Sequence, residues 1–310
     1  MITFCLKHSE LDPWFNLAAE EYLLKNLTED FFIIWRSERS IVVGKHQNAL
    51  AEINHEFVRN NDIHVARRLS GGGTVFHDPG NVNFTFIRTV KEISEVNFKI
   101  FTQPIVQSLQ KLGVDAYTTG RNDLMLDGKK ISGNAEHVYK KRVLHHGTLL
   151  FNSDLSKLKG ALQVDLSRFE DKSVQSNRSP VTNISGYLKE PMTVEEFSDF
   201  IFGDVQNTFQ EKKTYELTEQ DIAAIEALRD EKYVTWDWVY GYSPKYIFRN
   251  TISSFSGEIK IEMSVIKGVI QEIKTEGLLP GISAKIIGKR HRMEDFQDLP
   301  EAGLLQKLLF

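Results

Sequence analysis

Three consecutive glycines, Gly71–Gly73, constrain this 310-residue chain more than any other local feature. They follow the pair Arg67-Arg68 and separate two stretches that have the composition of strands. A run without Cβ atoms lets backbone N–H groups approach a ligand closely and adopt positive φ angles. The neighbouring arginines suit a phosphate or a carboxylate, because a guanidinium can bind two oxygens at once. A flexible surface loop is the alternative, since the run matches neither the GxxxxGK[ST] nor the GxGxxG phosphate-binding pattern.

Strand and helix patterns surround this loop. Asp12-Pro13 predicts a helix start, because aspartate can cap free N–H groups and proline suits the first helical position. Asp127-Gly128 predicts a tight hairpin turn. We expect strands at 31–35, 41–43, from 65, at 81–88, in the hairpin 123–131 and at 149–151, and helices at 52–60, 98–112, 193–209 and 218–231.

The pattern changes near residues 236–244, which contain two tryptophans and a Gly-Tyr-Ser-Pro turn. Beyond them, two strands at 261–266 and 269–273 flank the turn Lys267-Gly268, and a helix follows. We therefore expect one domain over residues 1–245 and a small C-terminal domain over residues 246–310.

Composition excludes several classes of function. The net charge of −4 gives no general argument for nucleic acid as a partner. Cys5 is the single cysteine, so no internal disulfide forms, and a reducing compartment is expected. Residues 1–20 lack the basic start of a signal peptide, and the apolar runs are too short to span a bilayer. We expect a cytoplasmic protein with no membrane segment.

A second segment places polar residues beside a turn. Gly120-Arg121-Asn122-Asp123-Leu124 precedes the hairpin, and Lys129-Lys130 leaves it toward Ser132-Gly133. A lysine at a strand end can be aimed at a bound acyl phosphate and can neutralise charge that develops in phosphoryl or acyl transfer. A solvated lysine pair is the alternative, because lysines are mostly exposed.

A third segment contains the pair His145-His146, followed by Gly147. Adjacent residues of a strand point to opposite faces, and neither a cysteine partner nor an HxxxH spacing accompanies the pair, so zinc is disfavoured. We expect one of the two histidines to support a pocket. For His77, a role in orienting the backbone stays open beside a reactive one.

Taken in order, the runs RRLSGGGTVFHDPGN, GRNDL, KKISGNA and HHGTLL resemble the lipoate–protein ligases. The stretch DPWFNLAAEE near the N-terminus and the stretch VGKHQN at 43–48 fit the same family. Four ordered motifs are far more specific than any one of them. The resemblance covers residues 1–245.

This resemblance implies an α+β fold, with a biotin/lipoate-ligase-like mixed sheet domain and a small C-terminal α+β domain. It implies that lipoate and Mg-ATP react to give lipoyl-AMP, and that the lipoyl group then passes to a lysine of a carrier domain. The implied substrates are ATP with Mg²⁺ and lipoate or octanoate. The implied partners are the lipoyl carrier domains of the 2-oxoacid dehydrogenases and the glycine-cleavage H protein, with no nucleic acid and no membrane.

The resemblance also implies roles by position. Lys130 falls on the family's essential lysine, in K-[IV]-S-G-x-A, and Asp123 falls on the nucleotide side, where it would bind Mg²⁺. The acyl pocket is expected to include Trp35, Val43, His146 and Gly147. The residues expected to bind the nucleotide and lipoyl-AMP are Arg68, Ser70, Gly71, Gly72, Gly73, Thr74, Val75, Phe76, His77, Asn81, Asn122, Asp123, Ser132, Gly133 and Ala135.

One position departs from the family pattern, because His137 stands where some members have an arginine. A lipoyltransferase that uses preformed lipoyl-AMP and a non-catalytic acyl-binding relative remain alternatives. An octanoyltransferase with a cysteine nucleophile is disfavoured because Cys5 lies outside the motifs. A biotin ligase is disfavoured because its GRGRxG-type pattern is absent.

Overall fold

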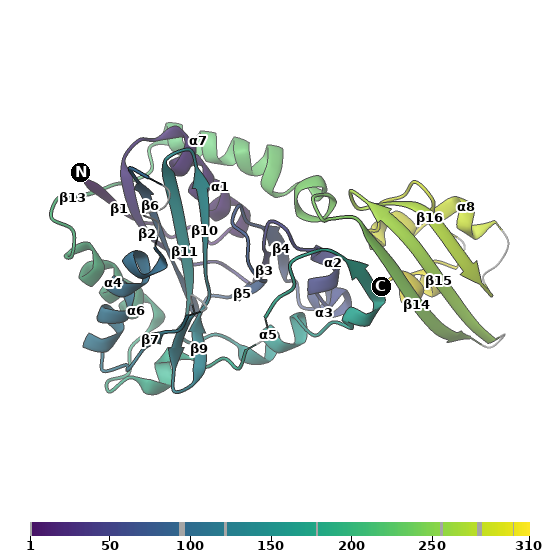
Figure 1. Ribbon diagram of the computed structural model, residues 1–310, viewed down its shortest axis with the longest axis horizontal. Helices are drawn as coiled ribbons and strands as arrows, with labels where there is room; N and C mark the ends of the chain where they lie inside the picture. Colours follow the sequence, from purple (N-terminus) through teal and green to yellow (C-terminus); the bar gives the residue numbers. More distant parts are fainter. Residues whose placement is uncertain are drawn as a thin grey trace.

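The computed structural model describes residues 2–92, 97–120, 123–177, 179–254, 257–277, 281–299 and 301–310. The molecule is elongated, with a large body of sheets and helices at one end and a small sheet with short helices at the other (Figure 1).

A six-stranded sheet forms the centre of the large body. Its strands are β1 (Thr3–Lys7), β2 (Asp30–Trp35), β6 (Asn81–Thr89), β10 (Asn134–Tyr139), β11 (Arg142–Leu150) and β13 (Lys212–Thr214). The order across the sheet is β10-β11-β6-β2-β1-β13. β1 runs parallel to β2 and to β13, whereas the other neighbours are antiparallel, so the sheet is mixed.

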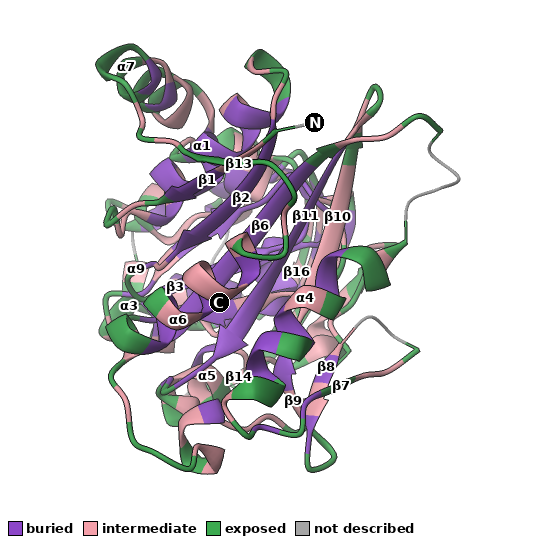
Figure 2. Ribbon diagram, turned by 90° about the vertical axis from the view of Figure 1, so that its left-hand side faces the viewer, coloured by how far each residue is buried: buried purple, intermediate pink, exposed green. Residues whose placement is uncertain are grey.

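Both faces of this sheet are covered, and its central strands are therefore buried along most of their length (Figure 2). On one face, α4 (Phe98–Lys111) and α6 (Val194–Gln206) pack against Phe32 and Ile34 of β2. On the other face, α1 (Pro13–Asn26) packs against Phe31 and Ile33. Side chains alternate between the faces of a strand, so β2 reads as a continuous apolar run because both of its faces are covered.

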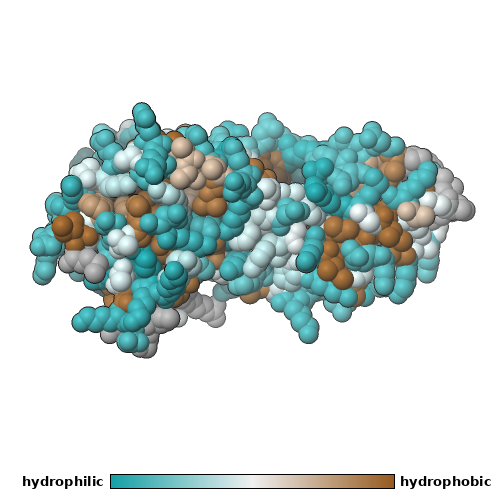
Figure 3. All heavy atoms as spheres, turned by 90° about the horizontal axis from the view of Figure 1, so that it is seen from above, coloured by the Kyte–Doolittle hydropathy of each residue, from teal (hydrophilic) through white to brown (hydrophobic). Residues whose placement is uncertain are grey.

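Hydrophilic residues cover most of the surface seen from above, and apolar residues form separate patches on it (Figure 3). Across the described residues, every helix is too short or too polar to cross a bilayer.

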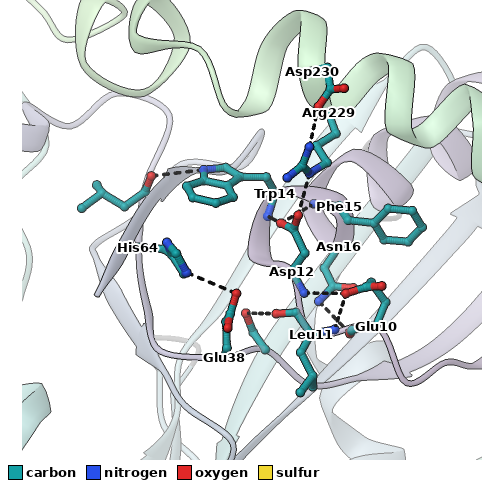
Figure 4. A network of polar contacts seen from close by, with 12 residues as sticks. Glu10, Leu11, Asp12, Trp14, Phe15, Asn16, Glu38, His64, Arg229 and Asp230 are labelled. Atoms are coloured by element: carbon teal, nitrogen blue, oxygen red, sulfur yellow. Dashed lines mark hydrogen bonds and ion pairs between the residues drawn. The ribbon is translucent and has the colours of Figure 1, made fainter. Parts of the chain in front are cut away.

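The predicted helix start at Asp12-Pro13 is confirmed. Asp12 Oδ1 accepts hydrogen bonds from the backbone N–H groups of Trp14 at 2.7 Å and Phe15 at 3.1 Å (Figure 4). Its other carboxylate oxygen accepts from Arg229 Nε at 2.6 Å. Arg229 directly follows α7 (Glu219–Leu228), so this cap also ties the first helix to a late one.

Replacing Asp12 with alanine is expected to lower the free energy of unfolding by about 1–2 kcal/mol, because two amides of α1 and the Arg229 guanidinium lose their acceptor. The ion pair is partly exposed and contributes less than the cap. Urea unfolding of the wild type and the variant measures the effect. Asp12→Asn keeps a capping oxygen and should retain most of the stability; a loss equal to that of alanine would contradict the capping role.

Two three-stranded sheets complete the large body. β3 (Ser40–Val43) lies between β4 (His64–Arg67) and β5 (Val75–His77), while β8 (Leu124–Leu126) lies between β7 (Tyr117–Thr118) and β9 (Lys129–Ser132). The predicted turn Asp127-Gly128 joins β8 to β9, with φ angles of 50° and 70°. Positive φ at both residues suits the twist of a two-residue hairpin.

The sequence predicts one helix over residues 52–60, which is wrong, because the structure has two. These are α2 (Ala49–Glu52) and α3 (His55–Asn60), and α5 (Leu155–Ala161) packs on α3. Asn48 accepts a hydrogen bond from Leu50 N, and Asn54 accepts one from Phe57 N. Each asparagine therefore begins a helix of its own.

The small sheet contains β14 (Tyr246–Ser254), β15 (Gly257–Ile266) and β16 (Val269–Glu276), and the predicted turn at Lys267-Gly268 joins the last two. The sequence pattern predicts neither β14 nor β12 (Phe169–Asp171), which comes from before residue 245 and pairs with β14. α8 (Ile282–Ile286) contacts β16, and α9 (Ala302–Leu309) contacts β14. Leu50 of α2 packs into the same apolar core.

His291 is buried in this core. The Tyr246 hydroxyl donates to its Nδ1 at 2.8 Å, and its Nε2 donates to the Leu309 carbonyl at 2.7 Å. Burial lowers the pKa of His291 to about 4. Below about pH 6.5 the unfolded chain binds a proton that the folded chain does not, so the free energy of unfolding falls as the pH drops toward about 4.

We expect His291 to account for a loss of about 2 kcal/mol between about pH 7.5 and about pH 5. Urea unfolding at the two pH values measures the difference. In His291→Gln the pH-dependent loss should shrink by that amount. An identical pH dependence in His291→Gln and the wild type would contradict this account.

Candidate active site

A cavity of about 490 Å³ lies beside the glycine loop. Residues from α1, from strands of all three sheets of the large body and from the segment at 176–177 line it. The structure thus brings together most of the residues predicted from the sequence. The lining includes Trp35, Arg68, Gly71, Gly72, Gly73, Thr74, Val75, His77, Asp123, Lys130, Gly133, Ala135, His146 and Gly147.

The glycine loop, residues 70–74, is packed on both sides. Gly72 has a φ of +84°, and a Cβ on Gly44 would lie 2.1 Å from the Gly72 carbonyl oxygen. A Cβ on Gly73 would come within 3.2 Å of Ser176. Glycine is therefore required at Gly44 and at Gly72, and the alternative of a flexible surface loop does not fit this packing.

Arg68 shapes this loop from inside. Its buried guanidinium donates to Ser70 Oγ at 2.9 Å, to the Val42 carbonyl at 3.0 Å, and to the carbonyls of Gly71 and Gly73 at 2.6 and 2.7 Å. These bonds occupy four of its five N–H groups. Burial lowers the pKa of Arg68 to about 10, which leaves it charged at neutral pH. Arg68 therefore holds the loop carbonyls, and the two-oxygen fork that the sequence suggested for a ligand is already in use.

Arg67 points away from the cavity and is completely buried. Burial lowers its pKa to about 10. Its guanidinium joins the turn before α2 to the segment that leads into the small sheet. The acceptors are the carbonyls of Gly44, Lys45, Gln47, Trp238 and Val239 and the hydroxyl of Ser243.

Lys130, the second residue of β9, brings an ammonium group to the cavity. Its Nζ lies 2.9 Å from Asp123 Oδ1, and the two side chains are 23% and 17% exposed. A Cβ at Gly133 would lie 3.2 Å from that Nζ, so the glycine leaves room for the lysine head. Lys129, one residue earlier on the strand, is exposed. Of the two lysines, Lys130 is thus the one that can meet a ligand in the cavity.

His146 forms another wall. Its Nδ1 lies 2.9 Å from Glu20 Oε2, and its Nε2 lies 2.6 Å from Ser70 Oγ. Because a carboxylate can only accept, the Nδ1–H group of His146 donates to Glu20, and this bond fixes the direction of the ring.

Glu20 connects this histidine to an apolar wall. It accepts a hydrogen bond from Thr85 Oγ1 at 2.5 Å, and Thr85 Oγ1 accepts from Trp35 Nε1 at 3.0 Å. The rings and chains of Trp35, Leu17 and Val42 line the cavity beside it. Glu20 was not among the predicted residues, although the sequence carries a signal for it: an acidic residue directly follows the apolar residues 17–19 of a helix that must bury one side.

Two predicted residues face away from the cavity. Val43 and Phe76 pack together in an apolar core, whereas their neighbours Val42 and Val75 line the cavity. Successive side chains of a strand point to opposite faces. A prediction that is shifted by one residue therefore selects a side chain that points away from the cavity. Of the two valines, Val42 and not the predicted Val43 therefore lines the cavity.

Ser70, Asn81 and Ser132 are fully buried beside the cavity and take part in side-chain hydrogen bonds instead of lining it. Asn81 donates to Asn83, which does reach the cavity. The remaining predicted residue, Asn122, lies outside the described residues.

The histidine pair diverges as predicted. His145 faces the other side of β11, where its Nδ1 lies 2.9 Å from Glu136 Oε1 and its ring stacks at 4.8 Å on Phe101. Both ring nitrogens of His77 are buried and lack a hydrogen-bond partner among the described residues. Burial lowers the pKa of His77 to about 3, so it is neutral at physiological pH. Within the described ranges, no three His, Cys, Asp or Glu side chains gather where they could hold a metal ion.

Comparison with known proteins shows the family of this chain. Residues 12–206 match the family model of the lipoyl protein ligase A/B catalytic domain. Lipoate–protein ligase 1 of Staphylococcus aureus is 41% identical over an alignment that covers 96% of this chain and 92% of the relative.

Solved structures share the predicted α+β fold of the biotin/lipoate ligases. A lipoate-protein ligase A bound with ATP is 26% identical, with a TM-score of 0.63 over 78% of this chain and 98% of that one. The bi-partite lipoate protein ligase of Thermoplasma acidophilum, studied with its E2 lipoyl domain, is 25% identical, with a TM-score of 0.65 over 78% and 96%. With a family match over residues 12–206 and a relative 41% identical along nearly the whole chain, this protein belongs to the lipoate–protein ligase family.

Proposed function

We propose that this enzyme activates lipoate with ATP to lipoyl-AMP in the cavity and transfers the lipoyl group to a lysine of a carrier domain. The observation that supports this most is the position of Lys130, whose ammonium lies on a cavity with a glycine loop on one side and apolar side chains on another. The name of the S. aureus relative and the ATP-bound structure support the same reaction.

In the first step a carboxylate oxygen of lipoate attacks the α-phosphorus of ATP, and the bond to the β-phosphate breaks to release pyrophosphate. Negative charge builds up on the α-phosphate oxygens during this step. The Lys130 ammonium is held at the cavity by Asp123 and can stabilise that charge without reorganising. Arg68 supports the step indirectly, by keeping the glycine loop in one shape.

In the second step the amine of the carrier lysine attacks the lipoyl carbonyl carbon. The bond to AMP breaks, an amide bond forms, and the amine releases a proton. The aliphatic chain and dithiolane of lipoate need an apolar surface, which Leu17, Trp35, Val42 and Val75 provide. His146, fixed by Glu20, borders this surface.

ATP reacts as its Mg²⁺ complex in this proposal, and Asp123 is the residue that would hold the ion. Mg²⁺ in such sites takes one or two carboxylates together with phosphate oxygens, so it needs no cage of three protein ligands. Asp123 fits this requirement, because its carboxylate lies on the cavity and is 17% exposed. The ion would supply charge neutralisation at the phosphates.

The proposal extends to the partners and the organisation of the chain. The carriers would be the lipoyl domains of 2-oxoacid dehydrogenases and the glycine-cleavage H protein, and octanoate would be an alternative acid. The single, buried Cys5 supports a cytoplasmic site of action. We also propose a catalytic domain over residues 1–245 and an accessory domain over residues 246–310, with β12 as a strand that the first lends to the second.

Formation of lipoyl-AMP tests the proposal. The purified protein is incubated with lipoate and Mg-ATP without a carrier, and both lipoyl-AMP and pyrophosphate are measured. Equal amounts of the two products, each dependent on lipoate, are expected. If neither forms although supplied lipoyl-AMP is transferred to a carrier, the protein is a lipoyltransferase. If it also fails to transfer, it is a binding relative.

A further inference from the structure

The segment that follows β12 crosses the glycine loop on its way to Lys130. We call residues 172–177 and 179–182 the strap. Near its end, Lys130 N donates to the Pro180 carbonyl at 2.8 Å, and Thr182 N donates to the Lys130 carbonyl at 3.1 Å. In its middle, Ser176 and Asn177 line the cavity. The position of the middle of the strap therefore defines one wall of the site.

Glu52 holds that middle in place. Ser176 N donates to Glu52 Oε1 at 3.2 Å, and Ser176 Oγ donates to Glu52 Oε2 at 2.5 Å. The same serine oxygen accepts from Thr74 N at 2.8 Å and from Gln47 Nε2 at 3.1 Å. The hydroxyl thus uses its one hydrogen and both lone pairs, and it joins the strap to the glycine loop.

The chemistry of this contact requires a carboxylate. Glu52 is only 7% exposed, and both of its oxygens accept hydrogen bonds from Ser176. An amide of the same size has one acceptor oxygen, so its NH₂ group would face either the Ser176 N–H or the serine oxygen, which already accepts from Thr74 and Gln47. In either orientation one of the hydrogen bonds at Ser176 would break.

The helix that carries Glu52 is itself held in place. Glu52 ends α2, in which Ala49 N donates to Ser243 Oγ at 3.2 Å and Leu50 packs into the core of the small sheet. We infer that Glu52 is a positioning residue for lipoate activation: its carboxylate fastens Ser176 of the strap onto the glycine loop and so fixes the cavity wall against which ATP and lipoate bind. This inference rests on the proposed function.

Glu52→Gln and Ser176→Ala test the inference, with Glu56→Gln as the matched control, because Glu56 is an exposed carboxylate on the next helix. In lipoyl-AMP formation, Glu52→Gln and Ser176→Ala should each raise the KM for ATP by about tenfold and change kcat much less. Amide hydrogen exchange in residues 172–177 should speed up by about tenfold. The double variant should be no worse than either single one, because both remove the same contact. Glu56→Gln should match the wild type throughout.

The inference would be overturned if Glu52→Gln changed neither the KM for ATP nor the rate of amide hydrogen exchange in the strap. A fall in kcat alone would also overturn it. A double variant whose effect is the product of the two single effects would also overturn it. Ser176→Ala removes only a hydroxyl and keeps the test intact if Glu52→Gln does not fold. If the wild type forms no lipoyl-AMP, the proposed function fails, while hydrogen exchange still decides whether Glu52 fastens the strap.

Discussion

Replacing Lys130 with alanine is expected to reduce lipoyl-AMP formation by about 10³-fold or more. The variant loses the ammonium that faces the cavity beside Asp123, and no other side chain of β9 replaces it there, because Lys129 is exposed and Ile131 and Ser132 are buried. The side chain is partly exposed, so the free energy of unfolding should stay within about 0.5 kcal/mol of the wild type. Pyrophosphate release and thermal unfolding measure the two quantities.

Lys129→Ala is the matched control for this variant, since Lys129 belongs to the same strand and is exposed. It should retain activity close to that of the wild type. If Lys129→Ala lost activity and Lys130→Ala kept it, the assignment of the lysine that stabilises the developing charge would be reversed. If a folded Lys130→Ala formed lipoyl-AMP at the wild-type rate, the proposed mechanism would be wrong.

Replacing Arg67 with alanine is expected to lower the free energy of unfolding by about 4 kcal/mol or more. Five backbone carbonyls and the Ser243 hydroxyl lose their donor inside the protein, and a cavity replaces the guanidinium. Two of those carbonyls, at Gly44 and Lys45, belong to the turn on which the glycine loop packs. Urea unfolding of wild type and variant measures the loss.

The free energy of unfolding of Arg67→Lys is expected to lie between those of the wild type and Arg67→Ala. An ammonium has only three N–H donors, whereas the guanidinium donates to five carbonyls and a hydroxyl. Arg39→Ala, at an exposed position just before β3, should change stability by less than about 0.5 kcal/mol. A loss in Arg67→Ala no larger than in Arg39→Ala would show that the buried hydrogen bonds of Arg67 contribute little.

Features that depend only on residues close in sequence, such as helix caps, tight turns and the alternation of strand side chains, were predicted from the sequence. The cap and first residue of α1, the Asp127-Gly128 turn and the opposite directions of His145 and His146 all follow from spacing and backbone preference, and the structure has each of them. The family motifs, read together, led to the same cavity, because most of their residues line it.

Features that depend on contacts distant in sequence were not predicted. β12 has three residues and is a strand only because it pairs with β14, more than 70 positions later. Glu20 reaches the site because α1 packs across the sheet onto β11. Val42 rather than Val43 lines the cavity because the orientation of β3 is set by its partners β4 and β5. The pairings of β12 and of β3 leave no local pattern in the sequence.

The mass of a carrier domain tests the central claim most directly. An apo lipoyl domain is incubated with the purified protein, lipoate and Mg-ATP, and its intact mass is measured with and without each component. We expect a gain of one lipoyl group that requires protein, lipoate and ATP together and is lost in a folded Lys130→Ala. A gain that needs supplied lipoyl-AMP, or no gain with any of several carriers, would contradict the claim that this protein is an ATP-dependent lipoate–protein ligase.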